Sequence, residues 1–292
     1  MTFVHSFWSK PLLNSKFKKY EEMLPVMLSN YAYSAFCIKR RGHKIKLFAD
    51  KIGAEMLDFI DYDEVTILDN LDNESIHFAA QIKFEALKRM TLDECLIDGD
   101  LFLREKPIFD IIQSINTDFL YSFYEPYTFV LRLDGIVEKY RGTTSLLLKH
   151  KDKFEYPYTI STADEDYQWP NTSFMRISNQ ELKDEYIRQY EYHKNLLKDE
   201  EFTEWPDVII EQQHMEKLVK SKGYSFRPMV FFFPSKATND YACMLGFVHL
   251  GAEKIRLKHL TYNWLKDENP QLLDAVFKQA EKYKEISFLK TY

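Results

Sequence analysis

The sequence predicts an α/β fold, in which a central, mostly parallel, Rossmann-type sheet is flanked by helices. Short apolar runs of strand length alternate along the chain with longer segments of helical periodicity. Residues 95–97 are apolar, and two carboxylates, Asp98 and Asp100, follow them directly. Apolar runs are typical of parallel strands buried on both faces, and open α/β sheets bind ligands beyond the carboxyl ends of such strands. The same stretch therefore predicts both the fold class and a candidate site.

The first half of the chain alternates strands and helices in the order of a Rossmann-like half. Strands are expected over residues 2–5, 44–49, 64–68 and 95–97, and helices over residues 23–41 and 75–90. In the first helix Met27, Tyr31 and Ala35 recur near the helical period, and Gly42 is a natural stop after it. We expect right-handed crossovers between the parallel strands.

The second half of the chain is less regular. Asn179 is placed to cap a helix over residues 180–197, and Asp207 to cap another that ends at Gly223. The other expected elements are helices over 107–114 and 270–283 and strands over 119–123, 169–177, 229–233 and 244–249. Between them, residues at about 125–168 read as an insertion that carries acceptor contacts. We expect one domain, residues 1–292, that includes this insertion.

Composition and charge exclude several classes of protein. The hydrophobic fraction of 45% supplies a substantial core, and the formal net charge of -6 gives no basic character that would bind nucleic acid. The three cysteines lie far apart in apolar contexts and are expected to be reduced core residues. We find no signal-type opening and no stretch apolar enough to span a bilayer, so we expect a cytoplasmic protein, with peripheral membrane association left open.

The Asp98-Gly99-Asp100 triplet indicates a metal site. Two carboxylates so close together repel each other unless a cation lies between them or one takes a proton. An oxygen-preferring divalent ion, Mn²⁺ or Mg²⁺, is the simplest solution. The competing interpretation is a solvated hairpin turn, because Asp-Gly is a common turn dipeptide.

The segment after the first strand offers a second candidate contact. Trp8 and Lys10 follow Ser6 in the expected loop 6–11, where an indole ring can stack on a base and an ammonium can meet a phosphate. A packed Trp and a surface Lys explain the same residues equally well.

A late motif follows the strand expected over residues 244–249. His249 leaves this strand, and Gly251 and Lys254 come shortly after it. These residues offer a metal ligand, a close backbone approach and a cation for phosphate. Alone, His249 would read as a histidine at the edge of the core before a turn.

Together these residues resemble the motifs of nucleotide-sugar glycosyltransferases of the GT-A fold, including bacterial polysaccharide and glycogenin-like types. Asp98 and Asp100 match the Asp-x-Asp motif. A late His-x-x-Gly-x-x-Lys motif supplies a metal ligand and a diphosphate contact in the glycogenin-like group. His249 and Lys254 match it, with Gly251 one residue closer to the histidine. The resemblance covers residues 1 to about 260.

The resemblance implies a GT-A-like fold and a metal-dependent, hexosyltransferase-type enzyme. Such an enzyme moves a sugar from a nucleotide-sugar donor to a glycan or other hydroxyl acceptor, and surface polysaccharide synthesis is one such role. The implied metal ligands are Asp98, Asp100 and His249. Glu211 is the nearest candidate for the base that an inverting enzyme needs. The implied substrate-binding residues are Ser6, Trp8, Lys83, Asp98, Asn171, Gln212 and Lys254.

Each implied role has a competing interpretation. Glu211 also reads as a solvated helix face, Lys83 as a snorkelling side chain and Asn171 as a strand-end cap. The whole chain also reads as a non-catalytic nucleotide-sugar or carbohydrate binding protein of the same fold. A haloacid-dehalogenase-like phosphatase is a third reading, but its Asp pair lies near the first strand, whereas Asp98 here follows several elements.

Overall fold

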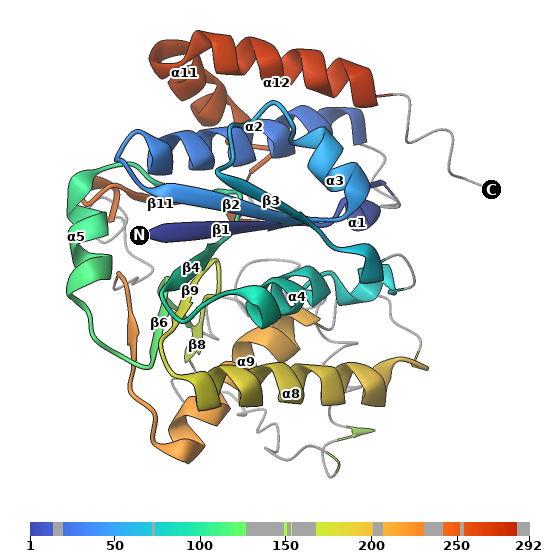
Figure 1. The fold of residues 1–292 in the computed structure, drawn as a ribbon, viewed down its shortest axis with the longest axis vertical. Helices are drawn as coiled ribbons and strands as arrows, with labels where there is room; N and C mark the ends of the chain where they lie inside the picture. The colour runs from blue at the N-terminus through green and yellow to red at the C-terminus, as the bar shows by residue number, and fades with distance from the viewer. Residues whose placement is uncertain are drawn as a thin grey trace. The chain divides into compact units, whose positions relative to one another are not determined.

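The computed structural model describes residues 1–13, 20–71, 74–126, 149–150, 153, 168–200, 207–230, 242–251 and 254–284 (Figure 1). The chain divides into two compact units. The first unit comprises Met1–Ile76, Glu94–Ile112 and Cys243–Tyr292, and the second comprises His77–Asp93 and Gln113–Ala242. The chain therefore leaves the first unit twice and returns to it twice, which places the Asp98 stretch and the late His249 motif in the same unit.

The first unit contains a parallel sheet in the order β4-β1-β2-β3. These strands are β1 (Thr2–Phe7), β2 (Lys44–Ala49), β3 (Glu64–Ile67) and β4 (Glu94–Ile97). Every residue of β4 and all but the first of β1 are buried, as expected for inner parallel strands. A separate antiparallel pair joins β5 (Leu101–Leu103) to β11 (Phe247–His249). The predicted fold class, a mostly parallel sheet flanked by helices, is confirmed.

Helix α2 lies between the parallel strands and the C-terminal helices α11 and α12 (Figure 1). The helices of this unit are α1 (Ser9–Leu13), α2 (Tyr20–Lys39), α3 (Lys51–Met56), α11 (Lys258–Glu268), α12 (Pro270–Tyr283) and α5 (Lys106–Ser114), which ends in the second unit. The carboxylate of Glu268 accepts a hydrogen bond from the Tyr33 hydroxyl at 2.9 Å and pairs with Arg40 and Arg104. These contacts attach the C-terminal helices to α2.

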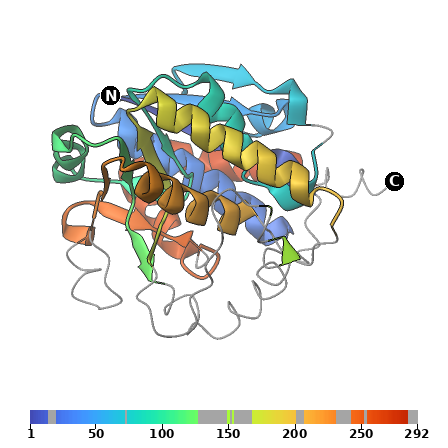
Figure 2. The ribbon, with the colours of Figure 1, turned by 90° about the horizontal axis from the view of Figure 1, so that it is seen from below.

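The described residues of the second unit form five strands and the helices α4, α8 and α9. Three of the strands run in the order β10-β6-β9, where β6 (Phe119–Tyr121) is parallel to β10 (Phe226–Pro228) and antiparallel to β9 (Phe174–Ile177). A further antiparallel pair joins β7 (Tyr124–Pro126) to β8 (Gln168–Pro170). The helices are α4 (Gln81–Arg89), α8 (Gln180–Leu197) and α9 (Asp207–Lys222). Figure 2 shows α9 beside α8, and Phe84 of α4 stacks on Tyr190 of α8 with 3.6 Å between ring centroids.

Several predicted bounds are confirmed and others are wrong for local reasons. Helices 180–197 and 270–283 are found as predicted, and Asn179 Oδ1 accepts from Leu182 N–H at 3.1 Å. β1 continues through Ser6 and Phe7, which were expected in a loop, because both pair with β2. The helix expected over 75–90 begins only at Gln81, after a 3₁₀ turn over Ile76–Phe78. Side chains three residues apart lie near the same face in both kinds of helix, so the apolar spacing did not separate them.

The strand expected over 169–177 is two strands, β8 and β9. Asn171 Oδ1 accepts from Ser173 N–H at 3.0 Å, which makes a turn that competes with strand pairing. Residues 231–233 of the strand expected over 229–233 lie outside the described residues, and β11 is shorter than the expected 244–249. Cys243 is exposed rather than in the core, and its apolar neighbour Met244 is 79% exposed. Apolar neighbours alone therefore did not predict burial there.

Two expectations stay predictions. Most of the insertion expected at about 125–168 lies outside the described residues, and the one-domain organisation of residues 1–292 is not tested. Among the described residues, none of the helices combines the length and the apolar character that crossing a membrane requires.

Candidate metal centre

The two aspartates lie just beyond the carboxyl end of β4. Asp98, Gly99 and Asp100 form a turn that closes when the Leu101 N–H donates to the Asp98 carbonyl oxygen at 3.1 Å. The next strand, β5, pairs with β11 and not with β4. The turn is therefore not a hairpin between β4 and β5, and the competing hairpin interpretation is wrong on this point.

Gly99 is required by the ring of Tyr31. A Cβ at this position would lie 2.4 Å from Tyr31 Cε2, far inside van der Waals contact. Tyr31 belongs to α2, is 7% exposed and donates its hydroxyl to the Ser6 carbonyl oxygen at 2.8 Å. The group that approaches Gly99 closely is therefore this aromatic ring.

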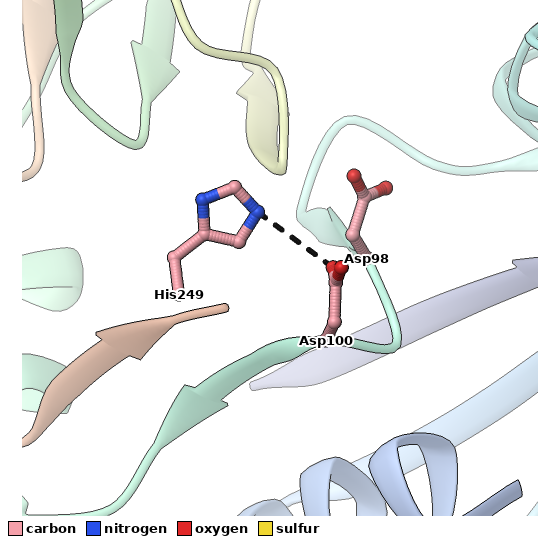
Figure 3. Close-up of side chains that lie close together, drawn as sticks. All are labelled: Asp98, Asp100 and His249. Carbon is pink, nitrogen blue, oxygen red and sulfur yellow. Dashed lines mark ion pairs between the residues drawn. The ribbon is translucent and has the colours of Figure 1, made fainter. Parts of the chain in front are cut away.

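The pairing of β5 with β11 places His249 beside Asp100. His249 is opposite Leu101 in the antiparallel register, and the following Leu250 N–H donates to the Asp100 carbonyl oxygen at 3.1 Å. His249 Nε2 lies 3.6 Å from Asp100 Oδ1 (Figure 3). Ligand atoms of Asp98, Asp100 and His249 all lie within 4.8 Å of one another. The predicted convergence of the late motif on the Asp pair is found.

Lys254 completes the electrostatic surroundings of Asp100. Its Nζ lies 2.8 Å from Asp100 Oδ2, while Asp100 is only 8% exposed. Burial alone would raise the pKa of Asp100, but Lys254 and His249 outweigh it and hold that pKa well below its usual range. Asp100 is therefore a charged carboxylate at neutral pH. Gly251, at φ +51°, makes the bend between these two partners, and only glycine adopts such a backbone readily.

Ser6 and Trp8, predicted to contact substrate, are both mostly buried in the first unit. Ser6 is 8% exposed within β1, and Trp8 is 5% exposed. Lys10 Nζ lies 5.9 Å from the centre of the Trp8 ring and donates to the Glu74 carbonyl oxygen at 2.9 Å. Base stacking on Trp8 stays a prediction, and the packed-Trp interpretation agrees with this burial.

The remaining predicted site residues lie in the second unit. Lys83 Nζ and Glu211 Oε1 form an ion pair at 3.1 Å, with side chains 15% and 5% exposed. Gln212 follows Glu211 on α9 and is 8% exposed. Asn171 is 4% exposed, and its side chain holds the turn before β9. The structure thus brings Lys83 and Glu211 together, and their catalytic or substrate roles stay predictions.

Sequence reasoning missed a polar cluster at the ends of β1 and β2. Asp50 follows β2, is 6% exposed and accepts from the Ser9 N–H at 2.9 Å and from the Gly53 N–H at 3.1 Å. The cluster fixes the start of α1 to the end of β2. Its signal was present, because a Ser and an Asp each follow a predicted strand closely, at the edge where ligands bind.

Comparison with known proteins adds structural neighbours. No protein-family model matches the sequence, and neither does any curated protein. The fold is similar to the apo-form glycosyltransferase GlyE of Streptococcus pneumoniae TIGR4, with a TM-score of 0.44 and 12% identity, covering 96% of this chain and 63% of that chain. GlyE and the two neighbours described next are all named as glycosyltransferases.

Two further neighbours have similar scores. The galactosyltransferase LgtC, in complex with donor and acceptor sugar analogs, gives a TM-score of 0.37 and 12% identity, covering 73% of this chain and 71% of that chain. Mouse xyloside xylosyltransferase 1 in its apo form gives 0.43 and 8% identity, covering 87% of this chain and 99% of that chain. At such identities an activity does not carry over from backbone likeness, and it has to follow from this chain's own side chains.

Proposed function

We propose that this chain is a metal-dependent glycosyltransferase that moves a sugar from a nucleotide-sugar donor to a hydroxyl acceptor. The observation that supports it is the meeting of Asp98, Asp100 and His249, with ligand atoms within 4.8 Å of one another and Lys254 beside them. These are the residues that the sequence resemblance names as the metal and diphosphate site. These four residues come from two distant segments of the chain, since Asp100 and Lys254 are 154 residues apart.

The donor set fits a divalent cation. Two carboxylates and an imidazole are oxygen and nitrogen ligands of the kind that Mn²⁺ accepts, and Mg²⁺ is the alternative where the carboxylates dominate. Asp100 already has its pKa held low, so it needs no proton loss to become a ligand. Asp98, Asp100 and His249 would hold the ion. When bound, such an ion neutralises the charge that develops on a nucleoside diphosphate leaving group.

The chain's own residues supply the rest of the site chemistry. Lys254 now pairs with Asp100, and its ammonium is suited to a diphosphate oxygen once the carboxylate has another partner. The Asp100 backbone is held through Leu250, so a shift of Lys254 need not move the ligands. Fixed charge at this position favours departure of the diphosphate.

The residues of the second unit keep the roles that the resemblance gave them. Lys83 and Gln212 are proposed to contact the donor, Asn171 the acceptor side, and Glu211 to act as base if the enzyme inverts. The ion pair between Lys83 and Glu211 supports a defined orientation of both side chains. The hexosyltransferase type, surface polysaccharide synthesis, a cytoplasmic location and peripheral membrane association are further parts of this proposal.

A thermal-shift screen of nucleotide sugars with and without Mn²⁺ tests the proposal. A ligand that binds only the folded protein raises the melting temperature by mass action. We expect at least one nucleotide sugar to raise it, and the rise to require Mn²⁺. Turnover of that donor, measured as release of the nucleoside diphosphate with a sugar acceptor, separates an enzyme from a binding protein. Stabilisation by nucleotide sugars that does not depend on Mn²⁺ would contradict the metal-dependent mechanism.

A further inference from the structure

A histidine lies fully buried in the core of the first unit, next to the strand that carries the Asp pair. His5 belongs to β1 and is opposite Ile97, the last residue of β4. Its Nδ1 lies 2.9 Å from the Tyr62 hydroxyl, and its Nε2 lies 3.0 Å from Ser34 Oγ. Ser34 in turn reaches the Leu101 carbonyl oxygen at 2.8 Å. These contacts form a hydrogen-bonded row of Tyr62, His5, Ser34 and Leu101. Because burying polar groups is costly unless they are hydrogen-bonded, this row is a specific feature of the core.

The direction of each hydrogen bond follows from elementary chemistry. Burial lowers the pKa of His5 to about 3, so its ring is neutral at neutral pH and has one N–H and one bare nitrogen. A carbonyl oxygen can only accept, so Ser34 donates its single hydroxyl hydrogen to Leu101 and must accept from His5. Nε2 therefore carries the proton, and Nδ1 accepts from the Tyr62 hydroxyl.

The row ends on the residue that closes the Asp98–Asp100 turn. The Leu101 N–H donates to the Asp98 carbonyl oxygen at 3.1 Å, while the Leu101 carbonyl oxygen accepts from Ser34. Leu101 is thus held on both of its backbone groups. Tyr31, three residues before Ser34 on α2, packs its ring on Gly99 and makes a T-shaped contact with the His5 ring, with 5.0 Å between the ring centroids.

We propose that His5, acting through Ser34, is a positioning residue of the candidate metal centre. Two carboxylates that face one another repel, and this repulsion tends to open the turn that carries them. The hydrogen-bonded row opposes this opening, because it fixes Leu101, the residue next to Asp100. The inference rests on the proposed function only in taking Mn²⁺ as the ion that uses the arrangement. His5 touches neither substrate nor ion and acts only on geometry.

The test compares two serine substitutions on the same helix. Ser34→Ala cuts the row at its last step. Ser29→Ala is the matched control, because Ser29 is also fully buried on α2 and also donates to a backbone carbonyl oxygen, that of Val26 at 2.9 Å. Mn²⁺ affinity is measured by calorimetry on the full chain. Hydrogen exchange of the peptide that contains Leu101 is measured by mass spectrometry without metal.

We expect Ser34→Ala to weaken Mn²⁺ binding by about tenfold, the lower end of the usual effect of residues that orient metal ligands, and to speed exchange at Leu101. Ser29→Ala should leave both unchanged. Tyr62→Phe, which removes the first donor of the row and leaves Ser34 in place, should shift both in the same direction but less. It also serves as the second variant if Ser34→Ala does not fold.

Each outcome decides the proposal. Equal Mn²⁺ affinity in the Ser34→Ala and Ser29→Ala proteins would overturn it, whether or not exchange changes. If the parent protein binds no Mn²⁺ at all, the proposed function is wrong, and exchange alone decides whether the row positions the turn. Unchanged exchange in both Ser34→Ala and Tyr62→Phe would then overturn the positioning role as well.

Discussion

The two units each gather charged side chains, but in different arrangements. In the first unit, ligand atoms of Asp98, Asp100 and His249 lie within 4.8 Å of one another, and Lys254 Nζ lies 2.8 Å from Asp100 Oδ2. In the second unit, Lys83 and Glu211 are one cation and one anion at 3.1 Å. Three side chains that bring oxygen and nitrogen ligand atoms together suit a divalent cation, whereas a cation–anion pair is equally compatible with a structural role.

The supports of the two groups also differ. Asp100 and His249 are fixed by backbone contacts, namely the β5–β11 pairing and the Leu250 N–H. Lys83 and Glu211 project from α4 and α9, and their contact is one between side chains. We therefore expect substitutions in the first group to change ligand binding more than folding, and substitutions in the second to change folding more than metal binding.

The largest effect is expected for Asp100→Asn. It keeps the size of the side chain but removes a ligand charge, so Mn²⁺-dependent nucleotide-sugar binding should be lost almost completely. The metal-free protein should lose about 1–3 kcal/mol, because Lys254 loses a charged partner that is 8% exposed. Thermal shift with and without Mn²⁺ measures both. Asp110→Asn, at an exposed Asp–Lys pair of the same unit, is the control and should change neither.

Mn²⁺ binding as tight as the parent's in Asp100→Asn would show that the cluster is a structural ion pair, and that converging ligand atoms do not distinguish the two units.

Gly99→Ala should follow in size. The added Cβ would lie 2.4 Å from Tyr31 Cε2, so either the turn or the ring must move. We expect Mn²⁺ affinity to fall by about 10–100-fold, the range typical of disturbed ligand orientation. Calorimetry measures it. Tyr31→Ala in the same chain removes the obstructing ring and should restore part of the affinity, and a double variant no better than Gly99→Ala would contradict the steric explanation.

Lys83→Met should affect the second unit alone. Breaking this little-exposed ion pair should lower the free energy of unfolding by about 3 kcal/mol, measured by urea denaturation. The double substitution with Glu211→Gln removes both charges and should be less destabilised than the single one. The affinity for Mn²⁺, measured without a nucleotide sugar, should equal that of the parent protein. A large loss of Mn²⁺ affinity in Lys83→Met would mean that the two groups of charges are not independent.

The most gradual effect concerns pH and His5. Its pKa is about 3 in the folded protein and near 6.5 when unfolded, so between these values only the unfolded state takes up the proton. The His5 contribution to stability is complete above pH 6.5 and declines on acidification by at most about 1.4 kcal/mol per pH unit. The free energy of unfolding, measured by denaturation at each pH from 7 to 4, should fall less steeply with acidification in His5→Asn than in the parent. Equal pH dependence in the two proteins would exclude a neutral buried imidazole.

Part of this arrangement was predictable from the sequence because its signals are local. Residues 95–97 are an apolar run followed by two carboxylates, and that pattern alone places Asp98 and Asp100 at a strand end. Asn179 marks the start of α8 through its own side chain, which makes the bounds of that helix readable.

The rest depends on contacts between distant residues. Three-residue strands such as β5 and β11 carry little pattern of their own, and only their mutual pairing brings His249 to Asp100. The ring of Tyr31 on Gly99 and the partners of His5 likewise follow from how α2 packs. His5 directly after the apolar Phe3 and Val4 was a visible irregularity, but its partners Ser34 and Tyr62 give no signal that links them to it in sequence.

The segmented make-up of the first unit has a consequence for the order in which the protein folds during synthesis. Asp100 leaves the ribosome long before Lys254, which is 154 residues further along the chain. Until then the nascent chain has β1 to β4 but lacks the strand that pairs with β5, so the backbone edge of Leu101–Leu103 that β11 later pairs with has no strand beside it. Non-local pairing of this kind is slow to form and leaves partly made chains prone to association. Assembly of the ligand group therefore has to wait for the synthesis of β11, long after β1 to β4 have been made.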